Sequence, residues 1–242
     1  MTKAMAAHQP NFLPYLGFFD KMRSVDELGT EPGVFIIRED CQYVKRDFHS
    51  RNKIRIYNGW KWLNVPVKDN AVPLKDVKID TEGRINNVPW ATYHLRLIEA
   101  NYKKTPFFNK FYPDLKKIYL EPGDKLAEFN IRIIKYLAKC FGIKTKIILF
   151  HELPKSVNGN NASETLVNAS KAVGADIYLS GDGAKNYLDV SCFKDVKLKF
   201  QKYKHPVYPQ RFPGFVPYMS AIDALFNIGY LPRSGEVVKI TR

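Results

Sequence analysis

A histidine and a glutamine stand where the first apolar run of the chain ends, and both could serve chemistry. The run ends in His8-Gln9-Pro10, and a second proline, Pro14, precedes an apolar-periodic segment that begins at Leu16. Histidine titrates near neutral pH, so His8 could act as a general base or contact a phosphate, with Gln9 as a polar positioner. The two prolines fix two φ angles and stiffen the bend. The open alternative is a stiff connection without chemistry.

A second polar group follows the apolar run over residues 33–37. It contains Asp40, which could orient a histidine, and Gln42, which could position a substrate. Basic and polar side chains come next, and we expect contacts to phosphate from cations, since arginine can pair with it in a bidentate manner. The residues predicted to bind substrate here are Arg46, Arg51, Asn52 and Lys53.

Two later loops carry similar residues. Ser180-Gly181 follows an apolar run and invites interpretation as a phosphate loop, although it lacks the full spacing of a known fingerprint and a plain turn is the alternative. His205 and Tyr208 are a second pair of acid-base candidates. The remaining residues predicted to contact substrate are Tyr15 and Gln210.

The elements that must position these groups alternate between strand and helix. Short apolar runs separated by helical periodicity predict a Rossmann-like α/β fold with a mostly parallel sheet. In such sheets ligands bind beyond the carboxyl ends of the strands, so these polar loops would meet at one edge. We expect one domain over residues 1–242, with a β-hairpin insertion at about 53–67 and a helical middle segment, a potential subdomain, at about 88–141.

Local signals mark several boundaries. Asn58-Gly59 predicts a hairpin whose two central residues form a type I′ turn. Asn161 with Glu164, and Ser220 with Asp223, each predict a capping box at a helix start. Glycines predict the helix ends, at positions 142, 174 and 229. The aromatic residues of the middle segment recur at helical spacing, which favours packing over a stacking platform.

The composition limits the function classes. The chain has 242 residues and a formal net charge of +14, which favours polyanionic partners such as nucleic acid, nucleotide-linked substrates or an anionic membrane face. The charge is spread along the chain, so a solvated basic surface is the alternative. No apolar run is long enough to span a membrane and the three cysteines form no metal or disulfide pattern, so we expect a cytoplasmic protein.

The residues together resemble the WbqC-like family of bacterial proteins over nearly the whole chain. The resemblance rests on motifs in the same order: His8-Gln-Pro-x-x-Leu-Pro-Tyr-x-Gly17-x-x-x-Lys21, Asp40-x-Gln42-x-x-x-Arg46, Arg51-Asn52-Lys53-Ile54, Trp62-Leu63-x-x-Pro66-Val67, Trp90 with His94, Tyr178-Leu-Ser-Gly181, Gln201, His205-Pro206-x-Tyr208-x-Gln210 and Ser220-x-x-Asp223. A weaker likeness to nucleotide-binding α/β proteins that form adenylates concerns the architecture more than the use of ATP.

The resemblance implies an enzyme of surface-polysaccharide or O-antigen biosynthesis. The expected reaction is the transfer of an acyl or aminoacyl group to an amino sugar carried on a nucleotide. Activation could come from ATP, a thioester or a charged tRNA. The alternative is a non-catalytic binding protein for a nucleotide sugar or an RNA. A metal-dependent hydrolase has only scattered histidines in its favour, at positions 8, 49, 94, 151 and 205, so we expect no metal.

Overall fold

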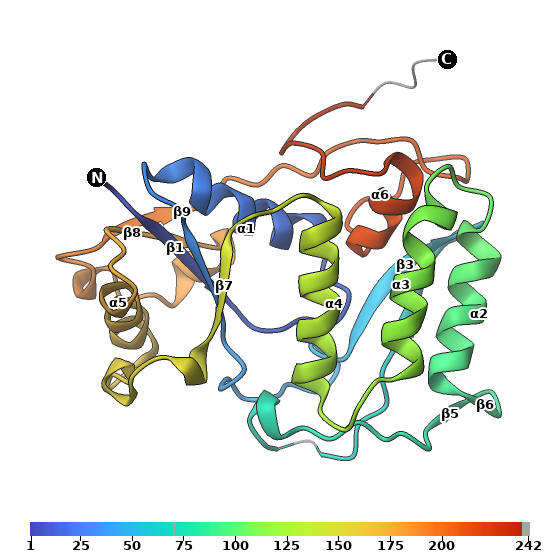
Figure 1. Ribbon diagram of the computed structural model, residues 1–242, viewed down its shortest axis with the longest axis horizontal. Coiled ribbons are helices and arrows are strands. Elements are labelled where there is room, and N and C mark those ends of the chain that lie inside the picture. The colour runs from blue at the N-terminus through green and yellow to red at the C-terminus, as the bar shows by residue number, and fades with distance from the viewer. Residues whose placement is uncertain (70, 239–242) are drawn as a thin grey trace. The chain divides into compact units, whose positions relative to one another are not determined.

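The computed structural model describes residues 1–69 and 71–238 of the chain (Figure 1). It divides into two compact units. Unit 1 consists of Met1–Gln9, Phe18–Asp40 and Ile143–Tyr203. Unit 2 consists of Pro10–Gly17, Cys41–Gly142 and the described residues from Lys204 onward. Each unit is therefore built from segments that lie far apart in the sequence.

Unit 1 contains a five-stranded parallel sheet, as the apolar runs predict. The strand order is β7-β2-β1-β8-β9, and each neighbouring pair runs parallel. β1 and β2 are buried almost throughout, whereas the edge strand β9 is half exposed. The bounds are β1 Ala4–His8, α1 Leu16–Leu28, β2 Val34–Ile37, β7 Lys146–Leu149, α5 Ala162–Ala172, β8 Ile177–Ser180 and β9 Lys197–Phe200.

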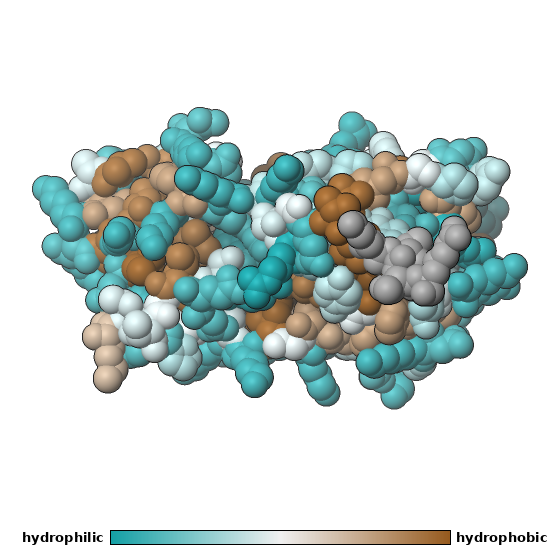
Figure 2. Space-filling view, turned by 90° about the horizontal axis from the view of Figure 1, so that it is seen from above, coloured by the Kyte–Doolittle hydropathy of each residue, from teal (hydrophilic) through white to brown (hydrophobic). Residues whose placement is uncertain are grey.

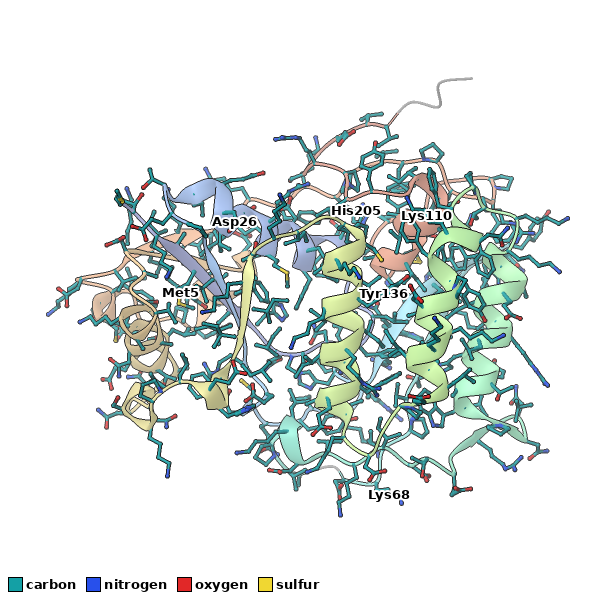
Figure 3. All side chains as sticks on the ribbon, viewed as in Figure 1. Met5, Asp26, Lys68, Lys110, Tyr136 and His205 are labelled. Carbon is teal, nitrogen blue, oxygen red and sulfur yellow. The ribbon has the colours of Figure 1, made fainter. Side chains whose placement is uncertain are left out.

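Helices cover both faces of this sheet. On one face, Met5 of β1 packs in a cluster with Leu166 of α5, and the Ser170 hydroxyl lies 3.1 Å from the Met5 sulfur (Figure 3). On the other face, Phe18 of α1 contacts the ring of Phe35, with centroids 5.2 Å apart. Strand β1 is therefore covered on both sides, which is the doubly wound arrangement of Rossmann-like proteins.

Unit 2 joins helices to a β-hairpin. Its longest helices are α2, α3 and α4, and each packs against the next in sequence. Tyr136 of α4 donates a hydrogen bond to the carbonyl of Phe111 in α3, close to Lys110 (Figure 3). The bounds are β3 Arg51–Ile56, β4 Gly59–Asn64, β5 Arg84–Ile85, β6 Val88–Pro89, α2 Trp90–Tyr102, α3 Phe108–Leu120, α4 Leu126–Cys140 and α6 Ala221–Ile228.

The predicted hairpin is present, but its turn lies one residue earlier than the sequence signal suggests. Ile56 pairs with Gly59, so the two turn residues are Tyr57 and Asn58. The positive φ of 124° falls on Gly59. The type I′ prediction for Asn58-Gly59 is therefore wrong. A glycine directly after the turn adopts this positive φ without steric strain.

Helix ends follow the sequence more closely than helix starts. Gly142, Gly174 and Gly229 all have positive φ and end α4, α5 and α6 as predicted. Asn161 caps α5 by accepting a hydrogen bond of 2.9 Å from the Glu164 amide. The Glu164 carboxylate, however, accepts a hydrogen bond from the backbone amide of Asn160 rather than from that of Asn161.

The capping box predicted at Ser220 is wrong. The Ser220 side chain makes no cap hydrogen bond, and the amide of Asp223 donates to the carbonyl of Ser220 instead. The carboxylate of Asp223 is turned into the core of unit 2, where tyrosine hydroxyl groups reach it. Because the Asp223 carboxylate accepts these hydrogen bonds in the core, it cannot also accept one from the backbone amide of Ser220, as a capping box requires.

No helix in the described part of the chain is long and apolar enough to cross a membrane. The face of the molecule in Figure 2 is largely hydrophilic, with separate hydrophobic patches between the polar side chains.

Candidate functional site

The strand order of unit 1 identifies the edge where a ligand would bind. Numbered by their order along the chain, the strands lie in the order 3-2-1-4-5, with β1 in the centre. The chain leaves β1 towards β2 on one side and later returns to β8 on the other. In doubly wound sheets this switch point, at the carboxyl ends of the strands, is where nucleotides bind. Here it lies between the end of β1 and the end of β8.

The end of β1 carries His8, as predicted. The ring of His8 packs edge-on against Phe18 of α1, with centroids 4.8 Å apart. Its Nδ1 lies 3.0 Å from the carbonyl oxygen of Gln9. Donation from Nδ1–H to that carbonyl selects the tautomer in which Nε2 is the basic nitrogen. A general base at the switch point would use this nitrogen.

A buried lysine lies beneath the same strand end. Lys21 of α1 is 4% exposed, and its Nζ donates to the carbonyl of Ala7 at 3.0 Å. Its ammonium group also lies 5.8 Å from the centre of the Phe35 ring. Burial lowers the pKa of the Lys21 ammonium from 10.5 to about 7, because the charged form loses its hydration. A lysine with such a pKa can exchange a proton near neutral pH.

The end of β8 contributes the predicted Ser180-Gly181 loop. Ser180 is buried and its carbonyl accepts a hydrogen bond of 2.8 Å from the Gln201 amide at the end of β9. The Gln201 side chain donates to Asp20 of α1 at 2.8 Å. Gly181 has an ordinary φ of −69°, and a Cβ added there would meet no atom within 4 Å. There is open space beside the Gly181 backbone.

The polar side chains at the ends of β2 and β7 are engaged with one another rather than open. Asp40 pairs with Arg38 through two hydrogen bonds of 2.7 Å, rather than with a histidine as expected. Its neighbour Glu39 is buried and accepts hydrogen bonds from the amides of Phe150 and His151, and it contacts Nδ1 of His151 at 2.8 Å. These carboxylates brace the loops that follow β2 and β7.

In unit 2 the structure brings the ring of His205 together with the rings of Tyr208 and Tyr218. Its Nδ1 lies 2.7 Å from the Pro206 carbonyl, and its Nε2 accepts a hydrogen bond of 3.0 Å from the Tyr218 amide. Burial lowers the pKa of His205, against the opposing effect of the Pro206 carbonyl. The ring of Tyr15, another predicted contact residue, lies 6.5 Å from that of Tyr218. Both ring nitrogens of His205 are thus engaged by the backbone.

Tyr208 and Gln210 lie beside this group but point to a buried carboxylate. The Tyr208 hydroxyl and the Gln210 amide each donate to Asp223 Oδ2 at 2.8 Å. Tyr102 of α2 donates to Asp223 Oδ1 at 2.9 Å. Tyr208 is only 2% exposed, and burial beside the carboxylate raises its pKa well above 10. Its surroundings are those of a side chain that holds the core together.

Asn52, predicted to position a substrate, is also buried. Its amide nitrogen donates to the Leu13 carbonyl at 2.7 Å, and Leu13 has an unusual positive φ of 43°. Asn130 of α4 donates to the carbonyls of Pro10 and His49 at 2.7 and 2.8 Å. Two side-chain amides therefore hold the Pro10–Gly17 turn within unit 2, in addition to its prolines.

The remaining predicted contacts lie on the surface of unit 2. Gln42 and Arg46 are exposed in the loop that precedes the hairpin, where Arg46 has a φ of 64°. Arg51 and Lys53 extend from β3 over tryptophan rings of β4. Among the described residues, no cluster of three or more histidine, cysteine or acidic side chains could hold a metal ion.

Lys21 is the residue at the switch point that was not predicted as part of the site. A signal for it does exist in the sequence, because Lys21 is spaced as an apolar residue between Phe18 and Val25 on the buried face of α1. A lysine at such a position is costly to bury and therefore indicates a functional or structural role. The carbonyl that it contacts cannot be identified from spacing alone.

Comparison with known proteins agrees with the sequence motifs. The model of the WbqC-like protein family matches residues 9–232. The chain is also 31% identical over 231 residues to the uncharacterized protein Rv1507c of Mycobacterium tuberculosis, an alignment that covers 94% of each chain. This match confirms the resemblance derived from the polar turns and the hairpin. The chain belongs to the WbqC-like protein family.

Proposed function

We propose that the protein transfers an acyl or aminoacyl group to the amine of a sugar carried on a nucleotide, in surface-polysaccharide biosynthesis. The observation that carries the proposal is the doubly wound strand order of unit 1, with His8 and the Ser180-Gly181 loop at its switch point. Doubly wound sheets bind nucleotides at this position. The polysaccharide setting is what the family resemblance implies, and the net charge of +14 suits a diphosphate.

In the proposed reaction the sugar amine attacks the acyl carbonyl. A C–N bond forms, the bond between the acyl carbon and its leaving group breaks, and the leaving group departs with the electron pair. Nε2 of His8 takes the proton that the amine loses and returns it to the leaving group. Lys21 holds the end of β1 through the Ala7 carbonyl and thereby positions His8.

Replacement of His8 by alanine should lower the turnover of the nucleotide-linked amino sugar by about 10²- to 10⁴-fold, because a positioned general base contributes roughly this factor. The measurement is mass spectrometry of the acylated product with defined donors, alongside circular dichroism to verify folding. His205→Ala serves as a comparison, because the backbone engages both ring nitrogens of His205. Unchanged turnover in both variants would contradict the assignment of either histidine to catalysis.

Gly181→Leu should block ligand binding without unfolding the protein. The φ of Gly181 suits any residue and a Cβ there has open space, so the added side chain should occupy the room proposed for the ligand. Wild-type protein should show a rise in melting temperature with nucleotides or nucleotide sugars, and the variant should lose it. Gly183→Leu is the matched control, since a Cβ at Gly183 also meets no atom within 4 Å. Equal shifts in all three proteins would place the ligand elsewhere.

The alternative is a binding protein without chemistry. It would show the same thermal shift and the same loss in Gly181→Leu, but no product with acyl-CoA, with ATP plus an amino acid, or with charged tRNA. His8→Ala would then change the affinity for the nucleotide sugar and nothing else. The two candidate functions are thus separated by product formation rather than by binding.

A further inference from the structure

We propose that the outward face of the β3–β4 hairpin is a binding surface for single-stranded nucleic acid. This surface, the hairpin face, consists of Phe48, Arg51, Lys53, Trp60 and Trp62. It lies wholly within unit 2. The proposal does not rest on acyl transfer in unit 1.

The register of the hairpin places these side chains on one side. Lys53 pairs with Trp62 and Arg55 pairs with Trp60, so alternate residues of both strands share a face. On the opposite face, Ile54 and Leu63 are fully buried in unit 2. A two-stranded sheet with one buried face usually carries polar side chains on the other. This one carries two tryptophans, and Trp60 is 45% exposed.

Cations and rings alternate across the hairpin face. The guanidinium carbon of Arg51 lies 4.3 Å from the centre of the Trp62 ring, and Nζ of Lys53 lies 5.1 Å from the Trp60 ring. The two tryptophan rings contact each other edge to face at 5.6 Å. Phe48, which is 43% exposed, extends the row beyond Trp62. Single-stranded nucleic acid binds to surfaces that combine aromatic rings, on which its bases stack, with cations that pair with its phosphates.

The charge of this segment is strongly one-sided. Residues 44–62 contain six basic side chains and a single acidic one, Asp47. Within the described part of the chain, neither Arg51 nor Lys53 forms an ion pair with a carboxylate. Their charges are therefore available to an anionic partner. The bases of a single-stranded nucleic acid stack on exposed rings while its phosphates pair with cations, so such a strand uses both components of the hairpin face.

Arg55 shares the outward side of the hairpin near its turn, but it is covered there and fixes the turn in place. Its side chain is 3% exposed and donates to the carbonyls of Gly59 at 2.7 Å and Pro213 at 2.7 Å. It thereby joins the turn of the hairpin to the 213–214 loop. Tyr57, 72% exposed, packs against Phe212 at 5.7 Å and adds a further ring beside the turn. A surface held this firmly loses little entropy when it binds.

The test is fluorescence anisotropy with labelled 12-mers of oligouridine, oligoadenine and oligothymidine at several salt concentrations. Wild-type protein should bind with an affinity that falls steeply with salt. Trp60→Ala and Trp62→Ala should each weaken binding roughly 5- to 150-fold, the effect of one lost stacking contact. Arg51→Gln with Lys53→Gln should lower the salt slope by about 1.4, because single-stranded binding loses about 0.7 per phosphate contact. Tighter binding of oligouridine than oligothymidine would identify RNA as the partner, and the reverse would identify DNA.

Three controls make the result decisive. Lys103→Gln with Lys104→Gln removes the same charge from an exposed part of unit 2 and should leave the affinity within about twofold of wild type. His8→Ala should bind oligonucleotides as wild type does. Circular dichroism and the buried Trp90 fluorescence report folding, and the Arg51/Lys53 variant keeps both hairpin tryptophans. The proposal would be overturned if the Arg51/Lys53 and Lys103/Lys104 double variants lost the same affinity, or if duplex RNA bound as tightly as single strands. It would also be overturned if the protein bound heparin and the tryptophan variants did not weaken that binding.

Discussion

Asp223→Ala should destabilise the protein by about 3–5 kcal/mol, a large part of the stability of an ordinary domain. Asp223 is fully buried, and its carboxylate accepts hydrogen bonds from Tyr102, Tyr208 and Gln210. Alanine would leave these donors without their acceptor, and each orphaned buried group costs about 1–3 kcal/mol. The damage would spread further, since the Tyr102 hydroxyl also accepts a hydrogen bond of 2.9 Å from the Arg55 amide of β3.

The loss should be graded across variants of this network. Asp223→Asn keeps one oxygen acceptor and should cost less than alanine, and Tyr208→Phe removes a single hydrogen bond and should cost about 1 kcal/mol. Asp114→Ala, at an exposed ion pair on α3, should change stability by less than about 0.5 kcal/mol. Urea denaturation with comparison of m-values measures each effect. A loss below about 1 kcal/mol for Asp223→Ala would contradict the role of the network.

The same variants test the predicted chemistry of Tyr208. If Tyr208 only holds the core together, Tyr208→Phe should lower the stability of the protein and leave its turnover at low temperature unchanged. If Tyr208 transfers a proton, Tyr208→Phe should lower turnover and leave stability unchanged. The structure places the Tyr208 hydroxyl 2.8 Å from Asp223 Oδ2, to which it donates a hydrogen bond.

The elements of the fold could largely be predicted from local patterns. The apolar run over residues 34–37, fully buried in β2, and the helical spacing of Trp90, His94 and Ile98 in α2 identified their elements, because strand and helix periodicity are properties of short segments. The helix ends at glycines could be predicted because glycine adopts the positive φ of a helix end without strain. The strand order was beyond such patterns, since β7 and β8 lie more than 100 residues from β1 along the chain.

The candidate site was harder to predict, for a related reason. His8 and Gly181 end strands whose carboxyl ends share one edge, and strand polarity predicts this grouping. The buried partners of Asn52 and Asp223 could not be predicted, because a polar side chain near a motif does not reveal its partner. The carbonyl that Asn52 holds is 39 residues away, and the hydroxyl group of Tyr102 lies 121 residues from Asp223. Such contacts depend on tertiary packing alone.

Lys21 should make the stability of the protein rise with pH between about 7 and 10. Its pKa is about 7 in the folded protein and 10.5 in an unfolded chain. Between these values the unfolded chain binds a proton at Lys21 that the folded protein lacks, so raising the pH favours folding. The slope is at most about 1.4 kcal/mol per pH unit. Below pH 7 both states hold the proton and the dependence from Lys21 vanishes.

The contribution of Lys21 can be isolated with Lys21→Met, which keeps the apolar stem and removes the amine. The free energy of unfolding of the wild type, minus that of the variant, should increase by up to about 4 kcal/mol from pH 7 to pH 10. Other titrating groups cancel in this difference, and Lys103→Met provides the comparison at an exposed lysine. A flat difference would mean that Lys21 keeps its proton in the folded protein. A difference that rises with pH would show that the Lys21 amine exchanges its proton near neutral pH. This amine contacts the carbonyl of Ala7, the residue before His8. Acyl transfer to an amine needs a proton acceptor in this pH range.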